Sequence, residues 1–269
     1  MELSRIILYT DIDGTAASTR NGKSDVSEKT KEALRAFVKE GGLFSVASGR
    51  SHVSVRKLFP DTEISLPMIE ANGAAVFDEK SGTYLSTHVL AADVKKEIYE
   101  YVQCHRELHL TAMDMLESRK VILQDDRDSV YIDYPRPMIS PAEFFAEKML
   151  KCAFIAEKEA IDAMVRIMNG YCLSHPVKAE RSADIYLEVF DAQAGKQNGI
   201  REVRKKPGLA DRMLVCVGDY YNDLGMLEEA DTAACPKDAA DEVKQLCDYI
   251  SPYGPEGALA DIIAYLRRR

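Results

Sequence analysis

The sequence predicts an α/β protein built on a doubly wound parallel sheet, with a smaller α+β domain inserted into it. Three observations predict this class. Short aliphatic and β-branched runs alternate with helical patterns towards both ends of the chain, as strands and helices do in parallel sheets. Polar clusters follow directly after several of these runs, where such sheets bind ligands. Between about residues 85 and 190 the pattern changes to mixed strands and helices.

Residues 1–84 form the first part of the predicted core. Residues 6–10 are a continuous apolar run, which indicates a strand buried on both faces. A helix is expected over 27–40, because Ser27 suits its cap position and two glycines follow its end. The apolar runs 43–47 and 67–70 predict two further strands.

Residues 191–269 form the second part of the core. The run 213–217 predicts a strongly apolar strand, and the runs 232–234 and 249–250 predict two more. Connections between parallel neighbours are almost always right-handed. We therefore expect these strands to join those of the first part in one parallel sheet.

Residues 85–190 predict a small α+β domain with an antiparallel sheet. Helical patterns cover 92–104 and 158–168. The predicted strands of this domain are the apolar runs 120–123, 129–132, 152–155 and 185–189.

The composition of the 269 residues excludes several classes of protein. No apolar stretch approaches the ~20 residues of a membrane helix, and no signal-peptide pattern begins the chain. The net charge of −9 argues against a nucleic-acid partner. The six cysteines contain no CxxC pair, which favours reduced thiols over disulfides or zinc ligands. We therefore expect a cytoplasmic protein with neither membrane nor nucleic acid as partner; the oligomeric state is not predicted.

Two carboxylates, Asp11 and Asp13, follow the first predicted strand, in the sequence Asp-Ile-Asp-Gly-Thr. An EF-hand loop is excluded, because its required glycine would fall on Ala16 and its bidentate glutamate on Gly22. Taken alone, the pair could still be two turn residues before a glycine. Its place at a strand end makes it a candidate for an active-site edge.

Three more polar clusters are expected at the same edge of the sheet. Ser48-Gly49-Arg50 follows the second strand, a cluster from Gly218 to Asp223 follows the strand 213–217, and Lys196 lies just before the preceding helix. Each alone could be a turn, a helix cap or a surface charge. Together they supply a nucleophile, a second carboxylate, a hydroxyl, a cation and a metal-binding acidic cluster, which suits phosphoryl transfer.

This ordered set resembles the haloacid dehalogenase (HAD) superfamily of phosphohydrolases. Residues 11–15 match its DxDGT motif and residues 218–223 its GDxxND motif. The resemblance covers about residues 5–75 and 190–263. The insert between the motifs, together with Asn72-Gly73-Ala74, resembles subclass IIB with an α/β cap, which includes Cof-like and sugar-phosphate phosphatases.

The resemblance implies a role for each residue that matches a motif. Asp11 would attack phosphorus and form an aspartyl-phosphate, and Asp13 would donate a proton to the leaving alcohol and then activate water. The residues implied to bind the phosphoryl group are Thr15, Ser48, Gly49 and Lys196.

The resemblance also implies a Mg²⁺ site. Its ligands would be Asp11, the backbone carbonyl of Asp13, and Asp219. Asn222 and Asp223 would complete the acidic cluster, as ligands through water or as hydrogen-bond partners of the ligands. Apart from the resemblance, Arg50 and Asn72 are candidates either for contact with substrate or for fixing of the loop.

Some polar residues of the insert stay outside these motifs. His105 and His109 are four residues apart and could hold a metal from one helical face, but a partly packed helix is the favoured interpretation. The side chains that could contact the leaving group are Tyr131, Tyr134, Arg136 and Arg181.

The function predicted from the sequence is a Mg²⁺-dependent phosphomonoester hydrolase that acts on a small phosphorylated metabolite, with sugar phosphates favoured. Two alternatives remain open at this stage. One is a phosphomutase of the same fold, and the other is a non-catalytic sugar-phosphate sensor. The sensor is disfavoured because every chemical position is filled.

Overall fold

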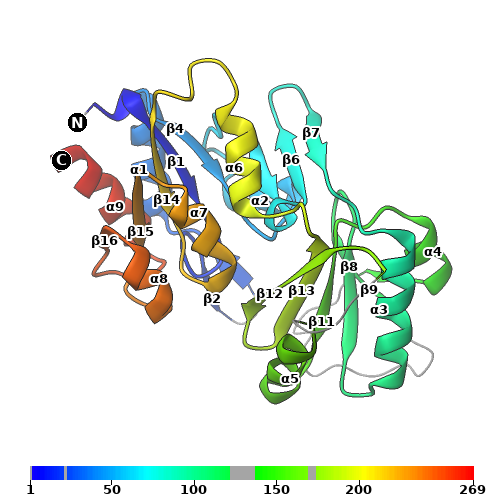
Figure 1. Cartoon of the computed structure of the whole chain (residues 1–269). Coiled ribbons are helices and arrows are strands. Elements are labelled where there is room, and N and C mark those ends of the chain that lie inside the picture. The colour runs from blue at the N-terminus through cyan, green and yellow to red at the C-terminus, as the bar shows by residue number, and fades with distance from the viewer. Residues whose placement is uncertain (1, 21–22, 122–136, 169–173) are drawn as a thin grey trace. The chain divides into compact units, whose positions relative to one another are not determined.

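The structure is a computed structural model that describes residues 2–20, 23–121, 137–168 and 174–269, and it divides into two compact units (Figure 1). The core unit comprises Met1–Ser86 and Gly195–Arg269, and the inserted unit comprises Thr87–Ala194. The predicted strand 129–132 lies outside the described residues, as do Tyr131, Tyr134 and Arg136.

The core unit contains a five-stranded parallel sheet in the order β16-β15-β14-β1-β4. Its strands are β1 (Ile6–Thr10), β4 (Leu43–Val46), β14 (Met213–Val217), β15 (Thr232–Cys235) and β16 (Tyr249–Ile250). All five were predicted as strands, and the doubly wound parallel sheet is confirmed. Thr10 at the end of β1 pairs with Val46 of β4 on one side and Val217 of β14 on the other, so these three strands end side by side.

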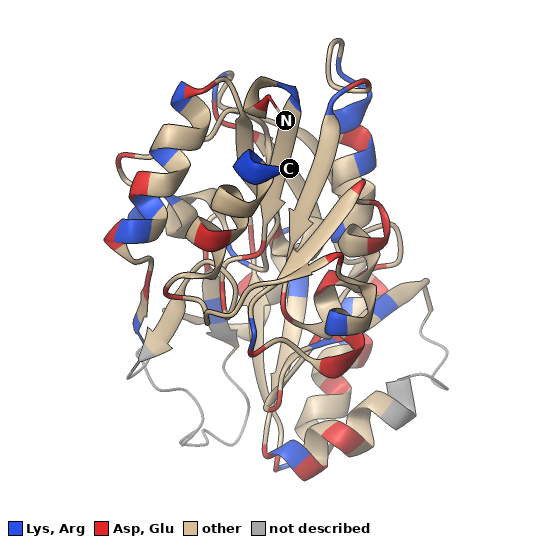
Figure 2. Cartoon of the chain, turned by 90° about the vertical axis from the view of Figure 1, so that its left-hand side faces the viewer, with Lys and Arg blue, Asp and Glu red and all other residues tan. Residues whose placement is uncertain are grey.

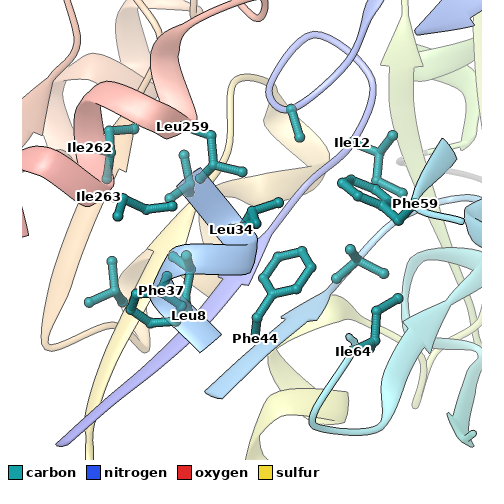
Figure 3. Packing of buried hydrophobic residues seen from close by; sticks show 14 of the residues in the cluster. Leu8, Ile12, Leu34, Phe37, Phe44, Phe59, Ile64, Leu259, Ile262 and Ile263 are labelled. Atoms are coloured by element: carbon teal, nitrogen blue, oxygen red, sulfur yellow. The ribbon is translucent and has the colours of Figure 1, made fainter. Parts of the chain in front are cut away.

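Helices cover both faces of this sheet. They are α1 (Glu28–Lys39), α2 (His52–Leu58), α6 (Lys196–Arg204), α7 (Leu224–Glu228), α8 (Asp241–Leu246) and α9 (Ala258–Arg268). On one face, Leu8 packs in an apolar cluster with residues of α1 and α9 such as Phe37 and Ile262 (Figure 3). On the other face, Tyr9 packs with residues of α6 and α7 such as Ile200 and Met226. Figure 2 shows both basic and acidic residues along the helical ribbons.

Two short antiparallel sheets flank the five strands. One is a hairpin of β2 (Ser18–Arg20) and β3 (Lys23–Asp25), and the other contains β5 (Met68–Glu70), β6 (Ala75–Asp78) and β7 (Thr83–Thr87). The strand predicted at 67–70 is therefore present, but its ladder partner is β6. One isolated parallel bridge, between Ala47 and Ile69, links it to the chain after β4.

The described strands of the inserted unit form a mostly antiparallel sheet in the order β10-β9-β8-β11-β13-β12. They are β8 (His109–Met113), β9 (Ser118–Val121), β10 (Met138–Ile139), β11 (Lys151–Ile155), β12 (Val177–Ala183) and β13 (Tyr186–Asp191). The helices of this unit are α3 (Ala92–Cys104), α4 (Pro141–Ala146) and α5 (Lys158–Met168). The ends of α3 and α5 match the sequence prediction.

The side chain of Lys95 stabilises the end of α4 in this unit. The buried Lys95 on α3 donates three hydrogen bonds to the carbonyls of Phe144, Phe145 and Glu147, at 3.0, 2.9 and 2.6 Å, and so satisfies the carbonyl groups at the end of α4.

The prediction that His105 and His109 lie on one helix is wrong, because α3 ends at Cys104 and His109 begins β8.

The described cysteines are free thiols, and Cys172 lies outside the described residues. Across those same residues, none of the helices has the length and apolar character that crossing a bilayer requires.

Glu70, the last residue of β5, has a fully buried carboxyl group. Its Oε1 accepts a hydrogen bond of 2.6 Å from the backbone N–H of His52, at the start of α2. The other oxygen, Oε2, has no hydrogen-bond partner. Burial raises the pKa of Glu70 to about 8, although the His52 N–H acts in the opposite direction.

This raised pKa predicts a pH-dependent stability. Between its ordinary pKa near 4.5 and about 8, Glu70 holds its proton in the folded protein and loses it in the unfolded chain. The free energy of unfolding should therefore fall as pH rises through this window, by at most about 1.4 kcal/mol per pH unit. Glu70→Gln removes the ionisation, so urea denaturation should show the variant gaining stability relative to the wild type with rising pH. A difference between the two proteins that is constant with pH would contradict this explanation.

Candidate active site

The polar loops that follow β1, β4 and β14 meet at one edge of the parallel sheet. The N–H of Asp11 donates to the carbonyl of Val217 at 2.8 Å, and the N–H of Ala47 donates to the carbonyl of Thr10 at 2.9 Å. These bonds extend the strand register by one residue beyond each end. The candidate residues that come directly after the three strands therefore lie beside one another, as expected for a parallel sheet.

Lys196, the first residue of α6, joins two of these loops. Its Nζ lies 2.6 Å from Asp11 Oδ1 and 2.6 Å from Asp223 Oδ1. All three residues are buried, with exposed fractions of 1% for Lys196, 5% for Asp11 and 0% for Asp223. Burial lowers the pKa of Lys196, but the two carboxylates raise it by more, and the net direction is upward. The lysine therefore stays charged.

Three carboxylates crowd around this lysine. Ligand atoms of Asp11, Asp219 and Asp223 all lie within 4.8 Å of one another. Burial raises the pKa of Asp11 above its usual range, although Lys196 acts in the opposite direction. Burial, helped by the charge of Asp223, raises the pKa of Asp219 to about 7. One ammonium group cannot balance three carboxylates, and their oxygens are the donors that a hard divalent cation prefers.

The three carboxylates differ in the oxygens left for such a cation. Asp223 is fully engaged, because its Oδ1 accepts from Lys196 and its Oδ2 accepts from the backbone N–H groups of Asp219 and Tyr220, at 2.9 and 3.2 Å. In contrast, Asp11 Oδ2 and Asp219 Oδ2 accept no hydrogen bond from the described residues. The group therefore fits a cation that is held by Asp11 and Asp219, with Asp223 supporting Lys196.

Two glycines allow the carboxylates to approach so closely. Gly14 has φ of +85°, and a Cβ there would lie 2.4 Å from Asp219 Oδ2. A Cβ on Gly218 would lie 2.5 Å from the Cβ of Asp223. Any other residue at these positions would push the acidic side chains apart.

The hydroxyl of Thr15 is directed to this cluster. Its Oγ1 donates to Asp219 Oδ1 at 2.5 Å, and the residue is fully buried. In this arrangement Thr15 orients Asp219.

Asp13 lies apart from the three clustered carboxylates. Its side chain is 45% exposed and is bound by both arms of the Arg50 guanidinium, with Nε 2.6 Å from Oδ2 and one terminal nitrogen 2.5 Å from Oδ1. Ser24, on β3, donates to the same Oδ1 at 3.1 Å. Of the two roles that the sequence left open for Arg50, this contact matches the fixing of a loop through a carboxylate. Ser24 was not identified from the sequence, because a serine in a short polar strand carries no pattern.

Ser48 and Asn72 connect two of the loops through the backbone. The carbonyl of Ser48 accepts from the N–H of Asn72 at 3.0 Å, and its Oγ accepts from the N–H of Arg50 at 3.3 Å. Gly49 lies in the bend between Ser48 and Arg50. Asn72 has φ of +55°, and its Oδ1 accepts from Asn222 Nδ2 at 3.4 Å. The eleven residues predicted for the active site therefore lie in the core unit, in the segments 11–15, 48–50, 72, 196 and 219–223.

Comparison with known proteins gives consistent matches over the whole chain. The family model for haloacid dehalogenase-like hydrolases matches residues 8–263. The 5-amino-6-(5-phospho-D-ribitylamino)uracil phosphatase YwtE of Bacillus subtilis is 23% identical over 286 residues, which cover 95% of this chain and 96% of that protein.

Solved structures show the same fold at low sequence identity. A HAD/COF-like hydrolase from Plasmodium vivax is 19% identical with a TM-score of 0.82, and the match covers 97% of this chain and 95% of that one. A sugar phosphatase of HAD subclass IIB, BT4131, is 18% identical with a TM-score of 0.75, covering 97% of this chain and 98% of that one.

The close contact at Gly14 predicts a specific loss of cation binding. Gly14→Ala should displace Asp219 and abolish most of the stabilisation that Mg²⁺ gives, which for an intact site is about 2.7 kcal/mol at a concentration 100 times Kd. The measurement is thermal denaturation with and without MgCl₂.

Gly82→Ala is the matched control. Gly82 has φ of +67° but nothing within 4 Å of its Cβ position, so both variants carry the backbone strain of about 1 kcal/mol. Only Gly14→Ala should lose the response to Mg²⁺. An equal response in the two variants would rule out this site.

Proposed function

The chain belongs to the haloacid dehalogenase-like hydrolase family and is a phosphatase of Cof-like type, and we propose that it hydrolyses phosphate monoesters with Mg²⁺ through an aspartyl-phosphate on Asp11. The observation that carries this proposal is the buried lysine that binds Asp11 and Asp223 at 2.6 Å each, beside the carboxylate of Asp219. A buried cation beside a crowded set of carboxylates that can hold a divalent cation suits the transfer of a strongly anionic group.

In the proposed reaction, the carboxylate of Asp11 is the nucleophile. Lys196 binds its Oδ1 and so fixes the direction of the carboxylate. The ammonium group also offsets negative charge on the phosphoryl oxygens in the transition state. Ser48, which follows the neighbouring strand β4, is the second proposed phosphoryl contact.

The residues that would hold Mg²⁺ are Asp11, Asp219 and the backbone carbonyl of Asp13. The two carboxylates fit this role because each keeps an oxygen that no described residue binds. When bound, Mg²⁺ supplies the positive charge that lets a phosphate dianion approach several carboxylates.

Asp13 is the proposed general acid and base. It is exposed, and its position two residues after Asp11 is at the same strand end. It donates a proton to the leaving alcohol in the first step and takes one from water in the second.

The proposed substrate is a small phosphorylated metabolite of the sugar-phosphate class. Support comes from the relatives, because one is named as a sugar phosphatase and another as a phosphatase of a phosphoribityl compound. We propose that the inserted unit, Thr87–Ala194, is the cap that selects the substrate. A cytoplasmic location stays a prediction of the sequence.

Removal of the nucleophile tests the proposal. With Mg²⁺ and p-nitrophenyl phosphate, Asp11→Asn should lower kcat by at least about 10³-fold, because the variant lacks the proposed nucleophile. Asp211→Asn is the control, since this exposed aspartate of the core unit lies outside the site. Undetectable wild-type activity, or unchanged activity in Asp11→Asn, would overturn the mechanism.

Removal of the metal is the second test. Chelation by EDTA should abolish phosphate release, and added MgCl₂ should restore it, because the acidic cluster repels the substrate without a cation. The assay should follow phosphate release from a panel of sugar phosphates. Isomerisation of a sugar phosphate without net release would identify a mutase instead.

A further inference from the structure

We propose that Arg50 and Ser24 are positioning residues that hold the carboxylate of Asp13 so that its Oδ2 carries the transferred proton. This inference rests on the proposed function, since it concerns the acid and base of the same reaction. It gives a role to Ser24, a residue of the β2–β3 hairpin that lies outside all of the sequence motifs.

The geometry around Asp13 is asymmetric. Oδ1 accepts two hydrogen bonds, one from Arg50 at 2.5 Å and one from Ser24 at 3.1 Å. Oδ2 accepts one, from Arg50 Nε at 2.6 Å. A carboxylate oxygen has two lone-pair sites, so among the described residues Oδ1 is saturated and Oδ2 keeps one site. The proton is therefore held and released at Oδ2.

The contacts are of a kind that fixes orientation. Arg50 binds both oxygens at once, and a planar fork of this type sets the plane of the carboxylate as well as its position. Ser24 binds both Asp13 and Arg50, because its Oγ also accepts a hydrogen bond from Arg50 at 2.6 Å. Asp13 is half exposed at 45%, and without these contacts its side chain would rotate freely in water.

The hairpin holds Ser24 in place. Ser24 pairs with Thr19 across β2 and β3, and the two hydroxyl oxygens lie 2.9 Å apart. Asp13 itself forms a bridge with Ala17, just before β2. The β2–β3 hairpin is thus joined to the loop that carries Asp13, and Arg50 connects this loop to the loop after β4.

The inference predicts that the two chemical steps respond differently to loss of Arg50. Formation of the aspartyl-phosphate transfers the phosphoryl group to Asp11 and the proton from Asp13 to the leaving oxygen. Hydrolysis then transfers the phosphoryl group to water, which gives a proton to Asp13. The first step needs little proton donation when the leaving group is a good one, whereas the second step needs the base with every substrate.

The test is rapid-mixing kinetics with p-nitrophenyl phosphate and phenyl phosphate, which differ little in size but strongly in leaving-group quality. With p-nitrophenyl phosphate, Arg50→Ala should retain a burst of one p-nitrophenol per enzyme, at a rate within about threefold of the wild type, while steady turnover falls about 10²-fold. With phenyl phosphate, the first step itself should also slow by about 10²-fold. A residue with a merely structural role would affect both esters alike.

Three further variants keep the test independent of folding. Arg50→Lys keeps the charge but not the fork, and should behave as Arg50→Ala does. Ser24→Ala removes a single hydroxyl and should lower turnover about fivefold, with the burst retained. Arg35→Ala is the control, because this arginine pairs with Glu28 on the exposed side of α1 and should leave both steps unchanged.

The possible failures are distinguishable. If the wild type releases no p-nitrophenol in the presence of Mg²⁺, the proposed function itself is wrong. If the wild type is active but Arg50→Ala loses the burst, or slows the first step equally with both esters, Arg50 acts on the phosphoryl group and the inference is overturned. Unchanged turnover in Arg50→Ala also overturns it.

Discussion

The buried ammonium group of Lys196 is the interaction on which the rest of the site depends. It connects Asp11, after β1, to Asp223, in the loop after β14, and Lys196 is the first residue of α6. Two buried carboxylates and one buried lysine are stable only together, because removal of the lysine or of the carboxylates leaves an uncompensated charge in a region of low dielectric constant. The lysine therefore fixes the positions of the loops after β1 and β14 relative to the start of α6.

The same interaction leaves a charge imbalance that suits catalysis. Lys196 offsets only part of the charge of Asp11, Asp219 and Asp223. Burial, together with the neighbouring carboxylates, raises the pKa of Asp11 and of Asp219. A divalent cation would offset the remaining negative charge. Asp13 lies outside this crowded group, in contact with Arg50, and it is exposed. In the proposed mechanism, the buried carboxylates therefore bind the charged groups, and the exposed one transfers protons.

Much of this arrangement follows from the sequence, because parallel strands end at one edge and helical periodicity is strong. Asp11, Lys196 and the 219–223 cluster could be assigned to one edge for that reason, and the ends of α3 and α5 were predicted correctly. The hairpin that carries Ser24 could not be found, since its strands are polar and only three residues long. For β8 the predicted helix fails, because pairing with β11 overrides the local spacing of His105 and His109.

The most direct measurement of the central claim is identification of the phosphorylated residue. The protein would be mixed with Mg²⁺ and a phosphate ester, quenched in acid within a single turnover, digested and mapped by mass spectrometry. The account predicts one phosphoryl group on the peptide that contains Asp11, at a level that rises and then falls as inorganic phosphate appears. Phosphate release with no phosphorylated peptide, or with the phosphoryl group on any other residue, would contradict it.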